Sequence, residues 1–138
     1  MLYKNILIAT AFSNNCERTL NHAKSIAATH NAELHLVHFV EPLPATAFSY
    51  AGTTLVDEKR LKSAREKLAI AVKTLGIPAA QAYLNEALPK AGIVNLAKKL
   101  NIDLIIVGSH GDSALAGLLR STADAVVHHS ICDILIVK

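Results

Sequence analysis

Apolar residues along the chain form five short runs, which are separated by longer stretches of mixed polarity. The runs at 5–10, 33–40, 103–108 and 133–138 are largely apolar at consecutive positions and partly β-branched, and a weaker run covers 79–85. Strands that are apolar on both faces fit a parallel sheet that is covered by helices on each side. We therefore predict a strand at each of these ranges.

Helical spacing of apolar residues marks the stretches between the runs. It predicts helices over 15–30, 55–75, 88–100 and about 122–129. Gly76 and Pro78 end the second helix, and Pro89 suits the first turn of the third. The expected buried positions of the first three helices are Leu20, Ala23, Ile26, Ala27, Leu61, Ala64, Leu68, Ala71, Leu75, Ile93, Leu96, Ala97 and Leu100.

The resulting order alternates strand and helix from one end to the other. Such alternation predicts an α/β fold in which a parallel sheet has right-handed crossovers and is sandwiched by helices, as in Rossmann-like proteins. The 138 residues fit a single domain over 1–138. One link, 41–54, is long for such a fold. A surface loop is the favoured interpretation, and a lid or a partner contact is the alternative.

A candidate site follows from the expected topology. In a five-stranded sheet of order 3-2-1-4-5, the order reverses between strands 1 and 4, and ligands of open α/β sheets sit beyond the carboxyl ends at that point. Strand 1 ends in ATAFSNN (9–15), and strand 4 leads into GSHGDSALAGLLRST (108–122). Glycines between a strand and a helix can close the backbone on a phosphate, or they can simply form a tight turn.

The start of the last predicted helix leaves the same choice open. Ser121 and Asp124 have the spacing of a capping box, so this helix terminus can satisfy its own N–H groups. The same N–H groups and the helix dipole can instead bind phosphate. The two interpretations compete, because a capped terminus has fewer free donors and Asp124 repels an anion.

Composition narrows the class of protein. The chain is 51% hydrophobic and 18% charged, which indicates a soluble globular domain. A net charge of +3 from dispersed Lys and Arg argues against a nucleic-acid partner. No apolar run has the length of a membrane span, and the first residues do not have a signal-peptide pattern. Cys16 and Cys132 are expected to be reduced thiols, and the cytoplasm is the expected compartment.

The sequence does not predict a metal site or catalytic residues. There is no H-x-x-x-H and no Cys/His cluster, and His35 and His38 lie three apart in one strand, so they point to opposite faces. His110 lies in the site loop and is a candidate ligand contact, but no orienting acid accompanies it in the strand 1 loop. We see no complete nucleophilic constellation.

The residues resemble the universal stress protein family over essentially the whole chain. The resemblance rests on KNILIAT at the start, the long link after strand 2, DLIIVGSHG at strand 4 and DILIVK at the end. The nucleotide-binding branch of the family carries G-x-x-G, nine residues, then G-[S/T]. Here Gly108 and Gly111 are followed by nine residues and by Ser121-Thr122, so the spacing is kept and the third glycine is lost.

Two further departures from the family pattern follow strands 1 and 3. ATP-binding members end strand 1 with an Asp that contacts the nucleoside, then a small residue and Ser, whereas this chain has Ala11, Phe12 and Ser13. Many members also have Gly after strand 3, where this chain has NEALPK. The branch typified by the founding member departs from the nucleotide motif as well and works without ATP.

The resemblance implies a stress-response protein that is not an enzyme and that forms a homodimer through its last strand, residues 131–138. It implies a degraded, weak site for ATP or AMP with Mg²⁺, and an unidentified protein partner. The alternatives are a genuine ATP-binding regulatory member and, third, a slow nucleotide hydrolase. Each site residue also has a purely structural interpretation. Val40 can simply be a core residue, and Thr122 can simply be the first residue of a helix. The candidate nucleotide-binding residues are Thr10, Ala11, Val40, Gly108, His110, Gly111, Ser121, Thr122 and Ala123.

Overall fold

A computed structural model describes residues 2–11, 17–39, 53–85, 89–108 and 132–137. Five parallel strands form one sheet in the order β3-β2-β1-β4-β5, which confirms the predicted fold class and strand order. The strands are β1 (Asn5–Ala11), β2 (Glu33–Phe39), β3 (Ala82–Asn85), β4 (Leu104–Gly108) and β5 (Asp133–Val137).

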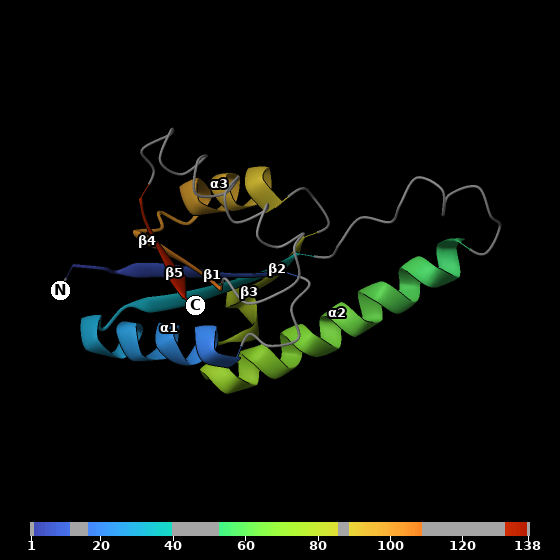
Figure 1. Ribbon diagram of the computed structural model, residues 1–138, viewed down its shortest axis with the longest axis horizontal. Helices are drawn as coiled ribbons and strands as arrows, with labels where there is room; N and C mark the ends of the chain where they lie inside the picture. Colours follow the sequence, from blue (N-terminus) through green and yellow to red (C-terminus); the bar gives the residue numbers. More distant parts are fainter. Residues whose placement is uncertain (1, 12–16, 40–52, 86–88, 109–131, 138) are drawn as a thin grey trace.

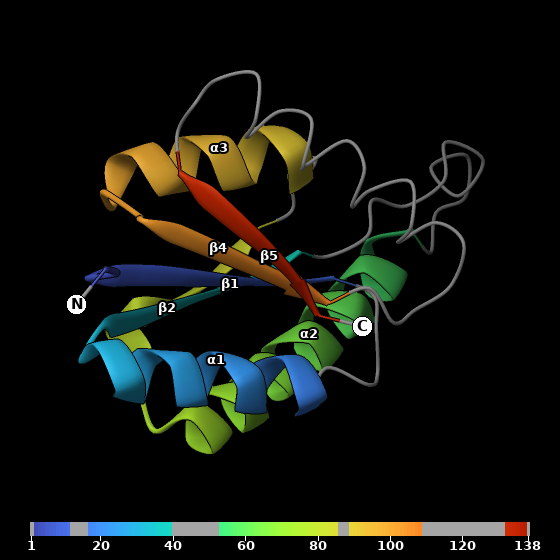
Figure 2. The ribbon, with the colours of Figure 1, turned by 60° about the vertical axis from the view of Figure 1, so that its left-hand side comes forward.

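Helices cover both faces of this sheet, as two-sided apolar strands require. Helices α1 (Glu17–His30) and α2 (Thr53–Leu75) lie on one face, and α3 (Pro89–Lys99) lies on the other (Figures 1 and 2). The first half of α2 extends past the carboxyl ends of the strands (Figure 1). The predicted helix over 122–129 lies outside the described residues.

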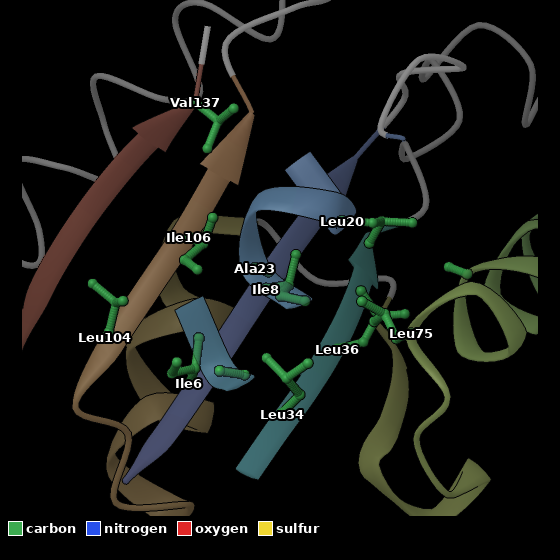
Figure 3. Close-up of a cluster of buried hydrophobic side chains, with 12 residues drawn as sticks. Ile6, Ile8, Leu20, Ala23, Leu34, Leu36, Leu75, Leu104, Ile106 and Val137 are labelled. Carbon is green, nitrogen blue, oxygen red and sulfur yellow. The ribbon is translucent and has the colours of Figure 1, made fainter. Parts of the chain in front are cut away.

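The described residues form two buried clusters, one on each face of the sheet. Alternate side chains of each strand point to opposite faces, so Ile6 and Ile8 of β1 join the α1 side and Leu7 joins the α3 side. Figure 3 shows Leu20 and Ala23 of α1 on the same side of the sheet as the strand residues of the first cluster. Fully burying an aliphatic side chain of this size stabilises the fold by about 1.5–3 kcal/mol.

Helices α1, α2 and α3 are each followed by a residue with a positive φ. We predict such a helix end from the sequence only at Gly76. Gly76 has φ 68°, and Asn31 and Asn101 have φ 52° and 55°. In each case the next residue donates its N–H back into the last helical turn: Ala32 to the carbonyl of Ala27 at 2.9 Å, Ile77 to Val72 at 3.4 Å and Ile102 to Ala97 at 2.9 Å. This left-handed cap satisfies carbonyls that the helix leaves unpaired, and Gly and Asn adopt it most easily.

Two predicted boundaries were wrong. The third strand begins at Ala82, because Ala79–Gln81 form a 3₁₀ turn in which the Gln81 N–H donates to the Pro78 carbonyl at 3.0 Å. Pairing of β2 with β3 starts at Leu36↔Ala82, so residues 79–81 lie outside the ladder. Helix α2 begins at Thr53 rather than 55, which shortens the predicted 41–54 link; residues 40–52 lie outside the described residues.

Candidate functional site

The strand order reverses at β1, where the sequence predicts the site. β1 pairs with β2 on one side and with β4 on the other, and the crossover from β3 to β4 passes β1. The carboxyl ends of β1 and β4 are therefore neighbours. This is the position at which open parallel sheets bind ligands.

The two strand ends separate at this point. The register of β1 with β4 stops at Ala9↔Val107, whereas its register with β2 continues to Ala11↔Phe39. On the other side, Gly108 of β4 is paired with Val137 of β5. The last residues of β1 are thus paired with β2, and the last residue of β4 is paired with β5. Among the described residues, Thr10 and Ala11 of β1 are not paired with β4.

The structure describes part of the predicted nucleotide-binding set. Thr10 and Ala11 are the last two residues of β1, and Gly108 is the last residue of β4, so these three lie on adjacent strand ends. Their role in binding stays a prediction. The remaining candidates lie outside the described residues: Val40, His110, Gly111, Ser121, Thr122 and Ala123.

A buried polar pair lies directly beneath this edge. Thr10 and His38 are register partners on β1 and β2, and the two residues are only 9% and 8% exposed. Thr10 Oγ1 and His38 Nδ1 are 2.8 Å apart, and Thr10 Oγ1 also donates to the Val37 carbonyl at 3.4 Å. His38 was missed as a site residue, although a polar residue near the end of each of two neighbouring apolar runs was a signal that the sequence offered.

The imidazole of His38 is neutral near pH 7. Burial lowers the pKa of His38 below its ordinary value of 6.5, and the positive charge of Lys67 on α2 lowers it further. A neutral ring has one N–H and one acceptor nitrogen, so the hydroxyl of Thr10 complements Nδ1 in either tautomer.

The second buried histidine, His35, lies toward the amino end of β2. Its Nε2 is 4.0 Å from Glu33 Oε2, and its Nδ1 has no hydrogen-bond partner among the described residues. Those residues also contain no cluster of His, Cys, Asp or Glu that could hold a metal ion. Within the same ranges, no helix is both long and apolar enough to span a membrane.

Comparison with known proteins identifies relatives over the whole chain. A model of the universal stress protein family matches residues 2–138. Universal stress protein A homolog 1 of Coxiella burnetii is 35% identical over 140 residues, which cover 99% of this chain and 97% of that protein. A universal stress protein of Thermus aquaticus is 33% identical over 141 residues, which cover 99% of this chain and all of that one.

Solved structures share the architecture. UspA of Lactobacillus plantarum is 22% identical and superposes with a TM-score of 0.77, covering 100% of this chain and 99% of that one. A universal stress protein crystallised in complex with cAMP is 26% identical, with a TM-score of 0.60, and the match covers 100% of this chain and 98% of that one.

Proposed function

Because the chain belongs to the universal stress protein family, we propose that it is a non-enzymatic stress-response protein with a weak adenine-nucleotide site at the separated ends of β1 and β4. The observation that carries the proposal is this separation at the point where the strand order reverses, since it offers backbone groups of two strands to one ligand. The relative bound to cAMP supports an adenine nucleotide as the ligand class.

The weakness of the site follows from two residues. The side chain of Ala11 cannot accept a hydrogen bond from a nucleoside, and Ser121 replaces the glycine that permits the closest backbone approach to phosphate. A missing hydrogen bond of this kind costs about 0.5–1.5 kcal/mol. Losing two such features weakens binding by roughly 10–100-fold, because each 1.4 kcal/mol is a factor of ten.

Titration calorimetry with ATP and Mg²⁺, repeated with AMP and cAMP, tests both parts of the proposal. The wild type should bind weakly, and the Ala11→Asp/Ser121→Gly double variant should bind ATP about 10–100-fold more tightly. Tight wild-type binding would instead favour the ATP-binding regulatory alternative. Wild-type protein that binds none of the three ligands would overturn the nucleotide site and favour a nucleotide-free interaction protein.

Phosphate release addresses the third function, a slow nucleotide hydrolase. The proposed binding module should release phosphate from ATP no faster than buffer does. Steady release above that background, abolished in a variant that no longer binds ATP, would overturn the non-enzymatic assignment.

We propose further that the protein forms a homodimer through β5. This strand is at the end of the sheet order and pairs with β4 on one side. Its Ile136 is 45% exposed. An apolar edge strand can pair with another strand, and a second copy in antiparallel orientation would provide that partner through a two-fold interface.

We also propose that the protein is located in the cytoplasm, because a free thiol such as Cys132 stays reduced there. Cell fractionation tests this location.

A further inference from the structure

The end of β1 depends on β2 for its position. Beyond Ala9, the register partners of β1 among the described residues all lie in β2, namely Thr10↔His38 and Ala11↔Phe39. The side chain of Thr10 points to the same face as Ile6 and Ile8, toward α1, because alternate residues of a strand share a face. Figure 3 shows Ile6 and Ile8 on that face. The Thr10 hydroxyl is therefore directed into the protein, and it is the backbone of Thr10 and Ala11 that borders the proposed site.

Among the described residues, one short contact holds the hydroxyl there. Thr10 Oγ1 lies 2.8 Å from His38 Nδ1, whereas its contact with the Val37 carbonyl is long, at 3.4 Å. Both side chains are buried. A buried polar group that loses its partner destabilises the conformation that buries it, so removing Nδ1 favours displacement of the end of β1.

We propose that His38 is a positioning residue for the nucleotide site, which acts through Nδ1 on the Thr10 hydroxyl and so keeps the backbone of Thr10 and Ala11 at the edge of the crevice. The proposal rests on the proposed function, since it concerns the same site. His38 does not contact the ligand in this scheme. His38 affects nucleotide affinity by fixing the position of the last residues of β1.

Two substitutions of His38 separate Nδ1 from the rest of the ring. The side-chain amide of Asn places a polar atom near the position of Nδ1, and that of Gln places one near Nε2. His38→Asn should therefore keep the bond to Thr10, and His38→Gln should lose it. Thr10→Ser and Thr10→Val form the matched pair on β1, because only the first keeps the hydroxyl.

The experiment is a ¹H–¹⁵N NMR titration of each variant with ATP and Mg²⁺ and with cAMP, far below its unfolding temperature. We expect His38→Asn and Thr10→Ser to bind within about twofold of the wild type. His38→Gln and Thr10→Val should bind about 3–10-fold more weakly, the range that one hydrogen bond supports. The double variant Thr10→Val/His38→Gln should bind no more weakly than either single one.

The outcomes distinguish this proposal from the proposed function. Wild-type protein that binds neither nucleotide overturns both. Wild-type binding with unchanged affinity in Thr10→Val and His38→Gln overturns only the positioning role, even where these variants unfold at lower temperature. Equal losses in His38→Asn and His38→Gln also overturn it, because Nδ1 would then not be the acting atom. Should His38→Gln fail to fold, the comparison of Thr10→Val with Thr10→Ser decides.

Discussion

The Asp103 carboxylate accepts a hydrogen bond from the backbone N–H of Asn5 at 2.9 Å, across 98 positions of sequence. The same oxygen accepts the Lys4 N–H at 2.8 Å. The Asp103 backbone adds two more links, because its N–H donates to the Asn5 carbonyl at 2.8 Å and its carbonyl accepts the Asp133 N–H at 3.2 Å. One residue thus joins the amino ends of β1, β4 and β5.

We expect Asp103→Ala to lower the free energy of unfolding by about 1–3 kcal/mol, because two backbone donors lose their acceptor. Asp103→Asn, which keeps a carbonyl oxygen, should lose less. Urea unfolding measures both. Glu66→Ala is the control, because Glu66 is an exposed carboxylate on α2. The free energy of unfolding of this variant should differ little from that of the wild type. A loss for Asp103→Ala no larger than for Glu66→Ala would contradict the role of these bonds.

Gly76 tests the left-handed helix caps. A Cβ at this position would meet nothing within 4 Å, so any effect of substitution comes from its φ of 68°. We expect Gly76→Ala to destabilise the protein by about 1–2 kcal/mol and Gly76→Asn to destabilise it less. Thermal unfolding monitored by circular dichroism distinguishes the two. Equal stability of Gly76→Ala and the wild type would show that the cap carries no conformational strain.

The dimer proposal makes a prediction about the edge of the sheet. Ile136→Lys places a charge on β5 and should give monomer or insoluble protein, because a buried, unpaired charge is unfavourable in an interface. Ile70→Lys is the matched control, since Ile70 is 68% exposed but lies on α2. Light scattering at micromolar concentration should show dimer for the wild type and for Ile70→Lys. Monomeric wild type would refute the interface.

Stability should depend on the protonation of His38. Its pKa is lowered in the folded protein, mainly by burial and additionally by Lys67, so below the ordinary pKa of 6.5 the unfolded chain binds more protons than the folded one. The stabilisation is therefore complete above that value and is lost as pH falls below it. Urea unfolding over a pH series should show a shallower loss in His38→Asn than in the wild type. Parallel curves would exclude a contribution from His38.

Cys132 should be a slow nucleophile. Burial, and secondarily the charges of Asp133 and Asp103, raise the pKa of the Cys132 thiol to about 11. Only the thiolate reacts, so at about pH 8 alkylation should be at least about tenfold slower than for glutathione. The Cys16→Ser variant isolates this thiol for mass spectrometry. A rate close to that of glutathione would contradict a half-buried, protonated Cys132.

The fold was predictable because its determinants are local. Apolar runs such as 103–108 set which segments become strands, and alternation with helices restricts how parallel strands can connect. The bounds of β1, β4 and β5 agree with the predicted ranges to within one residue. The family resemblance, which the comparisons confirm, rests on motifs in the same segments.

The strand ends that border the candidate site were predictable, and the binding role of their residues stays a prediction. The topology places Thr10, Ala11 and Gly108 at neighbouring strand ends, as expected. The partner of Thr10 was not expected. His38 was considered only as a metal ligand, because a pattern within one strand reveals which face a side chain takes but not which residue of the next strand lies beside it.

By itself the sequence determined the layers of this protein and its strand segments, since these follow from residue type and spacing along the chain. The departures at Ala11 and Ser121 follow from the sequence once it is compared with the family motif. Only the tertiary structure decided where β3 enters the ladder, that Asp103 joins three strands, and that Thr10 meets His38. Each of these depends on the register between segments that lie far apart in sequence. Local periodicity indicates which face of the sheet a side chain takes, but it does not indicate which residue of the neighbouring strand lies opposite.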